Sequence, residues 1–251
     1  MNAEERPRSP GTRVSDDGLT SDVIPVRHFF GTRDTPVGLH AHMQLGHITG
    51  GHQEFPSIVA LKQIHSTRVV VIRTDRGLGA LEQTEGDALV TNQPETLVVV
   101  RTADCVQVLL VEKTRGVVGA IHAGWRGAVA GIVAETIRAC VEEFGAKPEH
   151  MHVAIGPSIG PCCYEVDEPV MNPLRSRYPA WPGVLQETTE GKGVLDLKLL
   201  IHHQIRASGV PDSQIGRVDH CTHCRSDLFY SYRREGQVNG TMCSGIILPA
   251  A

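Results

Sequence analysis

From Val23 onward the sequence is a series of short apolar runs rich in β-branched residues, and their length limits the fold more than any other feature. Each run is followed by a polar or glycine-containing turn; examples are IVALKQI, RVVVI, TLVVV, VQVLLVE and VVGAIH. Runs of this kind, bounded by turn residues, are typical of buried strands. They are far shorter than the roughly 20 residues that a membrane-spanning helix needs, so we expect no membrane span.

Two amphipathic helices are predicted among these strands. In residues 126–144 apolar side chains recur at spacings of three and four, and Gly145 follows as a C-terminal cap. In residues 196–208 leucine and isoleucine form one stripe, with Asp196 as the N-cap and Gly209 as the stop. The segment CCYEVDEPVMNPL between them is expected to form a short helix, and SGIILP the last strand.

Strands and helices alternate without a regular βαβ pattern, which favours a mixed sheet over a doubly wound parallel one. We therefore predict an α/β fold with a single domain, in which a mixed β-sheet is flanked by helices. Residues 23–251 form this domain, and residues 1–22, which are polar and rich in Arg, Asp, Ser and Pro, form a disordered tail without a secretory signal.

Charge and cysteine content restrict the partners and the compartment. The net charge is −4 and no cluster of lysine or arginine is present, so nucleic acid is not an expected partner. The chain has 7 cysteines, an odd number, and they point to free thiols or metal ligands rather than to a disulfide framework. These features indicate a cytoplasmic protein.

Three residues at the ends of predicted strands form a candidate metal site. His65 follows an apolar run in LKQIHS, Cys105 interrupts one in RTADCVQVLL, and His122 precedes a glycine-rich turn in GAIHAGWRG. Two imidazoles and one thiolate suit zinc and leave a fourth position for water or substrate, as in a catalytic site. Spacing alone also allows a packed cysteine and two hydrogen-bonded histidines.

Six strings in the chain carry a family resemblance: LKQIHS, EGDALVT, RTADCVQVLL, AIHAGWRG, AIGPSIGPCCYEV and DLFYSYRREG. Together they resemble the YfiH-type family, long labelled multicopper polyphenol oxidase (laccase) and also called peptidoglycan editing factor. The resemblance extends from about Val23 to Leu248.

The resemblance implies a zinc site on His65, Cys105 and His122 and a single-domain α/β fold. It also implies phosphorolysis of purine nucleosides, including methylthioadenosine, and deamination of adenosine. A second implied activity is hydrolytic removal of serine from a muramyl cell-wall precursor. The chain departs from the family pattern in a shortened segment at 35–57 and in Thr241, which stands where the family commonly has arginine.

The histidine pattern favours zinc over copper. A multicopper oxidase uses paired His-x-His clusters and a cysteine flanked by histidines, whereas here only His40 and His42 have that spacing and Cys105 has no neighbouring histidine. Copper therefore remains the alternative metal.

Each candidate residue is given a role as a hypothesis. In deamination, water at the open zinc position is the nucleophile and Asp104 transfers protons, unless Asp104 only orients the strand end. Arg33, Arg126 and Arg233 are candidates for binding phosphate, or else form structural ion pairs. Two further hypotheses are a metal-free cysteine hydrolase, with Cys105 as nucleophile and His122 as base, and a non-enzymatic metal-responsive binding module.

The remaining cysteines include half of a possible structural zinc site. Cys221 and Cys224 have the spacing of such a half, and the second pair would have to be the adjacent Cys162 and Cys163. Packed or weakly reactive thiols are the simpler interpretation.

Overall fold

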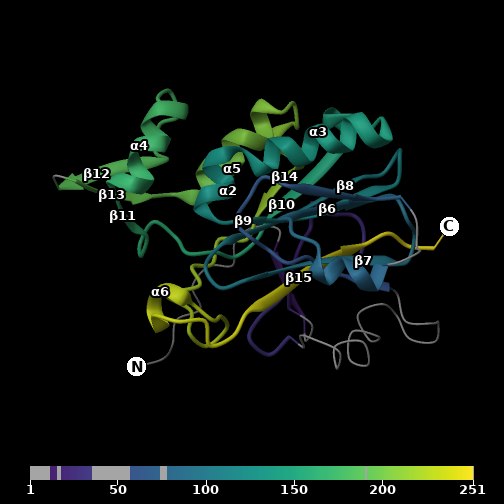
Figure 1. The fold of residues 1–251 in the computed structure, drawn as a ribbon, viewed down its shortest axis with the longest axis horizontal. Helices are drawn as coiled ribbons and strands as arrows, with labels where there is room; N and C mark the ends of the chain where they lie inside the picture. Colours follow the sequence, from purple (N-terminus) through teal and green to yellow (C-terminus); the bar gives the residue numbers. More distant parts are fainter. Residues whose placement is uncertain (1–11, 16–17, 36–56, 74–77, 190, 251) are drawn as a thin grey trace.

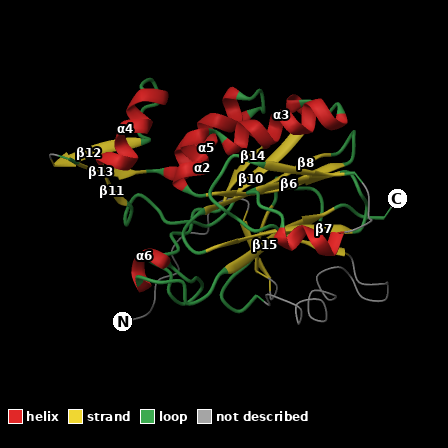
Figure 2. Cartoon of the chain, in the orientation of Figure 1, coloured by secondary structure: helices red, strands yellow, loops and turns green. Residues whose placement is uncertain are grey.

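The computed structural model describes residues 12–15, 18–35, 57–73, 78–189 and 191–250. These residues form three layers: a layer of helices, a six-stranded sheet beneath it, and a second six-stranded sheet beneath the first (Figures 1 and 2). A separate three-stranded sheet lies at one end of the helical layer.

The sheet furthest from the helices is mixed. Its strands are, in spatial order, β1 (Thr12–Ser15), β2 (Gly18–Ser21), β3 (His28–Phe30), β15 (Met242–Ile247), β7 (Thr96–Thr102) and β4 (Ser57–Val59). Only β4 and β7 pair in parallel; the other neighbours are antiparallel.

The sheet beneath the helices is also mixed and carries two of the candidate ligands. Its order is β14 (Ile215–Arg217), β10 (Met151–Ile155), β8 (Val106–Glu112), β9 (Val117–Ala123), β6 (Ala88–Thr91) and β5 (Val69–Ile72). The central antiparallel pair β8 and β9 is buried along its whole length. Burial on both faces explains why these strands read as continuous apolar runs rather than as alternating ones.

Helices and the small sheet complete the described chain. The α-helices are α2 (Trp125–Ala130), α3 (Ile132–Phe144), α4 (Glu168–Arg177), α5 (Leu197–Ala207) and α6 (Tyr232–Glu235), and the 3-10 helices are η1 (Leu78–Gln83), η2 (Pro148–His150) and η3 (Asp212–Gln214). The small sheet has the order β11 (Glu165–Asp167), β13 (Lys192–Leu195), β12 (Leu185–Thr189).

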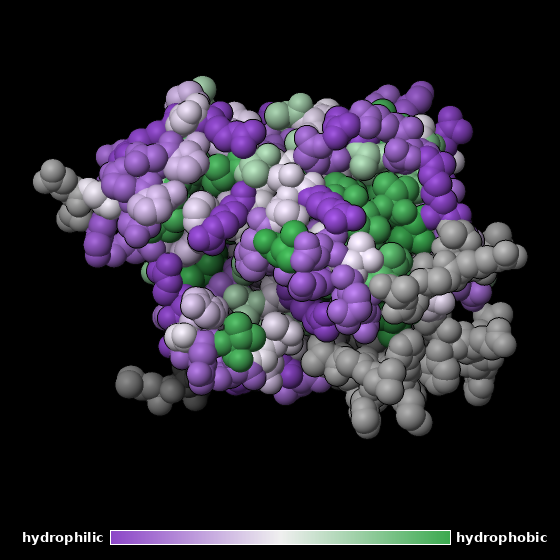
Figure 3. Space-filling model, in the orientation of Figure 1, coloured by the Kyte–Doolittle hydropathy of each residue, from purple (hydrophilic) through white to green (hydrophobic). Residues whose placement is uncertain are grey.

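Two apolar clusters hold the layers together. One lies between the helices and the sheet beneath them and includes Ile132 and Val133 of α3, Leu200 of α5 and Ile121 of β9. The other lies between the sheets and joins side chains such as Leu109 to Phe30, Val98 and Ile246. The upper edge of the molecule, where α3 lies, is mainly hydrophilic in Figure 3, as an amphipathic helix on the surface requires.

The predicted α/β single domain with helices on a mixed sheet is confirmed, and the structure adds a second mixed sheet. The helix at 196–208 is confirmed as α5, and the Asp196 side chain accepts a hydrogen bond from the Leu199 amide at 2.9 Å. The helix predicted over 126–144 is instead divided into α2 and α3, because Gly131 has a left-handed φ of 96°.

Two further expectations differ from the structure or concern residues outside its described part. Thr12–Ser15 and Gly18–Ser21, expected in a disordered tail over 1–22, form the antiparallel pair β1 and β2, while residues 1–11 and 16–17 lie outside the described residues. Most of the shortened segment at 35–57, including His40 and His42, is also outside them. None of the helices in the described part of the chain has the length and apolar character of a membrane span.

Candidate metal centre and its pocket

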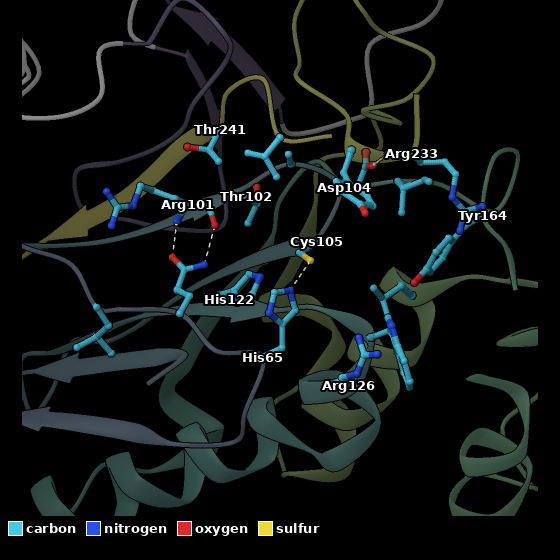
Figure 4. Close-up of a pocket in the computed structure, with 18 of the residues that line it drawn as sticks. His65, Arg101, Thr102, Asp104, Cys105, His122, Arg126, Tyr164, Arg233 and Thr241 are labelled. Atoms are coloured by element: carbon cyan, nitrogen blue, oxygen red, sulfur yellow. Dashed lines mark hydrogen bonds between the residues drawn. The ribbon is translucent and has the colours of Figure 1, made fainter. Parts of the chain in front are cut away.

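His65, Cys105 and His122 come together although they are far apart in sequence. One ligand atom from each can be chosen so that all three lie within 4.8 Å of one another. Cys105 Sγ is 3.9 Å from His65 Nε2, and the two imidazole rings meet edge to face with centroids 4.7 Å apart (Figure 4). We call these three residues the three-ligand centre.

The sheet and one loop position the three side chains. His122 is on β9 and Cys105 directly precedes β8, and the β8–β9 register pairs Val106 with Ala123, so Cys105 and Gly124 lie at the next position. A Cβ on Gly124 would be 2.7 Å from His65 Cδ2 and 3.0 Å from Cys105 Sγ. The glycine therefore leaves the space that the converging ligands occupy.

His65 lies in a loop, not at the end of a strand as the sequence suggested. The strand β4 ends at Val59, and His65 has a left-handed φ of 60°. The carboxylate of Asp87 holds this loop: it accepts hydrogen bonds from the amides of His65 at 2.9 Å and Ser66 at 2.6 Å. Tertiary hydrogen bonds, rather than strand pairing, thus fix the backbone that presents His65.

Asp87 also orients the second histidine. His122 Nδ1 lies 2.8 Å from Asp87 Oδ1, and both side chains are almost fully buried. When Nδ1 carries the proton and donates a hydrogen bond to the carboxylate, Nε2 is left unprotonated and can serve as a ligand atom. A single buried carboxylate therefore positions both imidazoles of the three-ligand centre.

The charges at the centre reinforce one another. Burial alone would raise the pKa of Cys105, but hydrogen bonds from His122 and His65 and their positive charge outweigh it and lower the pKa to about 7. Burial would lower the pKa of His122, but Asp87 and Cys105 outweigh it and raise the pKa to about 9. Burial likewise opposes ionisation of Asp87, yet His122 and Ser66 lower its pKa to about 2.

This donor set fits a metal ion. Two imidazole nitrogens and an easily ionised thiol converge at one point, and the hydrogen bond from His122 to Asp87 is the outer contact that metal-binding histidines usually make. Nitrogen and sulfur ligands of this softness suit zinc, and three protein ligands leave a fourth position open.

Asp104 adjoins the centre but its carboxylate is already engaged. It accepts hydrogen bonds from the hydroxyls of Thr222 at 2.5 Å and Ser231 at 3.0 Å and from the Arg233 amide at 2.7 Å. The residue itself has a left-handed φ of 88°. These bonds tie the chain before Cys105 to two segments near the C-terminus.

The three-ligand centre opens into a pocket of about 830 Å³. Of the predicted arginines, Arg126 and Arg233 line the pocket, whereas Arg33 is not among its lining residues. Arg33 instead donates to the Ser226 carbonyl at 2.7 Å and lies over the Tyr230 ring. Thr241, which the resemblance places where related sequences are expected to have arginine, does line the pocket.

Two pocket residues, Arg101 and Tyr164, were not predicted from the sequence. Arg101 and Thr241 lie on one side of the three ligands, and Arg126, Arg233 and Tyr164 lie on the other (Figure 4). Arg101 is held by Gln63, which accepts from its amide at 2.8 Å and donates to its carbonyl at 2.7 Å. A charged residue within the apolar run of β7 could have indicated that Arg101 faces a functional site.

Asp87 was also missed, although its position offered a hint. It is a carboxylate between a glycine and a buried strand, and only 1% of its surface is exposed. A charged residue is almost never buried without partners, so such a position indicates a structural or functional hydrogen-bonding role. Which groups it binds follows only from the tertiary structure.

The fold and the pocket define a class: mixed α/β proteins in which a candidate three-ligand metal site lines a pocket with cationic and aromatic residues. Comparison with known proteins identifies the family. The chain belongs to the family described as multi-copper polyphenol oxidoreductase laccase, whose model matches residues 32–249.

Relatives of known name are similar over most of their length. Purine nucleoside phosphorylase YlmD of Geobacillus stearothermophilus is 38% identical over 194 residues, 75% of this chain and 71% of that protein. Adenosine deaminase RL5, from an unknown prokaryotic organism, is 36% identical over 213 residues, 81% of this chain and 78% of that protein.

Solved structures show the same fold. The crystal structure of YlmD from Geobacillus stearothermophilus has a TM-score of 0.85 and 30% identity, and the match covers 97% of this chain and all of that one. The hypothetical protein YfiH of Bacillus licheniformis also has a TM-score of 0.85, with 28% identity over 96% of this chain and all of that one.

Proposed function

We propose that this protein is a zinc-dependent purine nucleoside phosphorylase that also deaminates adenosine and cleaves methylthioadenosine. The observation that carries the proposal is a pocket lined by the three-ligand centre together with Arg101, Arg126, Arg233 and several aromatic residues. The names of the relatives, purine nucleoside phosphorylase and adenosine deaminase, support the same two reactions. The partners are then small molecules: a purine nucleoside and phosphate.

His65 Nε2, Cys105 Sγ and His122 Nε2 would hold the zinc ion. When bound, zinc supplies Lewis acidity that allows a water molecule to act as a nucleophile near neutral pH. Asp87 keeps the His122 ring and the His65 backbone in the positions that binding needs. Gly124 keeps the space between the ligands free.

The pocket cations suit the phosphate substrate. In phosphorolysis a phosphate oxygen bonds to the ribose C1′ while the bond from C1′ to the purine nitrogen breaks, giving free base and ribose 1-phosphate. Guanidinium groups pair with phosphate oxygens through two parallel hydrogen bonds. We assign this role to Arg126 and Arg233, whose guanidinium groups lie over the rings of Trp125 and Tyr164 at 4.3 and 5.2 Å.

The aromatic residues of the pocket suit the purine. Trp125, Tyr164 and Tyr232 line the pocket, and flat apolar faces of this kind stack on nucleobases.

We assign Asp104 a positioning role. Thr222, Ser231 and the Arg233 amide occupy both of its carboxylate oxygens, so it orients the strand end beside Cys105 and holds Arg233 at the pocket. Proton transfer by Asp104 in deamination stays a prediction, and Asp104→Asn tests it: loss of deamination alone supports proton transfer, whereas parallel loss of both reactions supports positioning.

The experiment that tests the function uses zinc-loaded protein and a panel of nucleosides with and without phosphate. Adenosine, inosine and methylthioadenosine should release free base only when phosphate is present, and adenosine should also give inosine without phosphate. Cys105→Ala should abolish both reactions together with zinc binding at the three-ligand centre, while Cys140→Ala, a buried cysteine outside the pocket, should retain them. Retained turnover in Cys105→Ala would refute the assignment of the centre. Serine release from a muramyl precursor, with no nucleoside turnover, would replace the proposed function by the cell-wall reaction.

One geometric observation favours a second candidate, the metal-free cysteine hydrolase. Cys105, His122 and Asp87 form a thiol–imidazole–carboxylate chain, and the lowered pKa of Cys105 suits a nucleophile. The metal-free enzyme would be inactivated by alkylation and indifferent to chelators, whereas the zinc enzyme would lose activity on chelation and regain it with zinc.

A further inference from the structure

A second group of cysteine thiols lies outside the three-ligand centre. Cys162, Cys163, Cys221 and Cys224 can place their sulfur atoms within 4.8 Å of one another, and we call them the four-cysteine cluster. Cys224 Sγ is 3.4 Å from Cys163 Sγ and 3.7 Å from Cys162 Sγ. The two halves of the cluster are about 60 residues apart in sequence, so the fold assembles them.

Two adjacent parallel strands bring these halves together. Cys162 and Cys163 follow β10, and Cys221 and Cys224 follow β14; because β10 and β14 pair in parallel, both connecting segments leave the sheet at the same end. A parallel bridge between Ser158 and Cys221 continues the pairing beyond the strands. The Thr222 amide donates to the Ser158 carbonyl at 3.0 Å.

The separations between the sulfur atoms match one tetrahedral zinc ion. With Zn–S bonds of about 2.3 Å, the sulfurs of a tetrahedral site lie about 3.8 Å apart. Cys224 Sγ lies 3.4 and 3.7 Å from the sulfurs of Cys163 and Cys162, which is close to this value and well beyond the length of about 2.05 Å of a disulfide bond. We propose that Cys162, Cys163, Cys221 and Cys224 bind a structural zinc ion.

The local backbone supports a site built for thiolates. The Gly160 amide lies 3.2 Å from Cys221 Sγ, and N–H groups that donate to sulfur stabilise the negative thiolate of a metal site. A turn in which the Cys163 amide donates to the Gly160 carbonyl at 3.0 Å brings the adjacent Cys162 and Cys163 to the same side. Adjacent cysteines rarely chelate one ion, but this turn allows both thiols to reach the same point.

The four-cysteine cluster is connected to the pocket by short paths. Thr222, between Cys221 and Cys224 in the chain, donates to Asp104, which directly precedes Cys105. Tyr164, directly after Cys163, lines the pocket. A zinc ion bound by the four thiolates would therefore hold two pocket walls in place without contacting substrate.

Metal analysis of variants tests the inference. Zinc is measured per chain in protein purified without chelator, for the wild type, Cys105→Ala, the double variant Cys221→Ser/Cys224→Ser and the control Cys140→Ala. Cys105→Ala should keep one zinc ion per chain, because the four-cysteine cluster does not include Cys105. The double variant should lose one zinc ion relative to the wild type, and the control should lose none.

Two measurements on protein with an intact cluster keep the test decisive if the double variant fails to fold. Cobalt substituted into Cys105→Ala should give the intense visible absorption of a tetrahedral tetrathiolate site. Alkylation followed by mass spectrometry should show Cys162, Cys163, Cys221 and Cys224 protected with zinc and all modified after chelation. The proposal would be overturned if purified Cys105→Ala contained no metal, or if the four cysteines formed disulfide bonds in protein purified under reducing conditions. A bound iron–sulfur cluster would also overturn it.

Discussion

Replacement of Asp87 by asparagine tests how the three-ligand centre is positioned. The Asp87 carboxylate accepts from the amides of Ile64, His65 and Ser66, from the Ser66 hydroxyl and from His122 Nδ1. An asparagine has one acceptor oxygen instead of two, and its NH₂ group faces at least one of these backbone N–H groups whichever way it is turned. The change keeps the shape of the side chain but removes one acceptor oxygen and the negative charge beside His122.

The size of the effect follows from burial. Asp87 and His122 are 1% and 3% exposed, so water cannot replace the lost acceptor. A buried donor left without a partner costs about 1–3 kcal/mol of folding stability. Loss of the outer contact of a metal-binding histidine weakens metal binding by about 10- to 100-fold, which corresponds to about 1.4–2.8 kcal/mol.

The assay separates these two costs. Zinc affinity is measured by competition with a chromophoric chelator, and the free energy of unfolding by urea titration of the zinc-free protein. The control is Glu85→Gln, two residues earlier, whose carboxylate pairs with Lys62 at the exposed surface and should change neither quantity. If Asp87→Asn binds zinc within threefold of the wild type, the reasoning about positioning is refuted.

Three further predictions concern single side chains. Gly124→Ala should weaken zinc binding at least tenfold, because the new Cβ would collide with His65 and Cys105. The protein should still fold, because the φ of −67° at this position is allowed for alanine. Unchanged affinity in a zinc titration would contradict this prediction. Arg126→Ala should raise KM for phosphate at least tenfold, whereas Arg33→Ala, which removes a guanidinium outside the pocket lining, should not; equal effects in phosphate-dependent kinetics would count against the assignment. Burial lowers the pKa of His28 from 6.5, and the ring accepts a hydrogen bond from the Ser21 amide and faces the Val26 carbonyl. The unfolded chain therefore takes up the proton first as the pH falls, and the free energy of unfolding should decrease below about pH 6.5. His28→Gln should lose this part of the pH dependence in urea titrations, and parallel curves for the two proteins would disprove it.

Local sequence patterns predicted elements whose signals lie within a few residues. The stripe and the Asp196 cap define α5, and Gly145 ends α3, because hydrophobic periodicity and capping act over one or two helical turns. The break at Gly131 was not predicted, because an isolated glycine inside a helical pattern is usually tolerated. In the structure Gly131 is both the C-cap of α2 and the N-cap of α3.

The sequence by itself determined a strand-rich α/β chain with two amphipathic helices, and it marked His65, Cys105 and His122 as chemically suitable ligands. The tertiary structure alone decided that these side chains meet, that Asp87 holds two of them, and that Arg126 but not Arg33 lines the pocket. The physical reason is distance along the chain: helix and strand propensities depend on neighbouring residues, whereas a site formed by segments tens of residues apart depends on how the sheets pair and on which buried polar groups find partners.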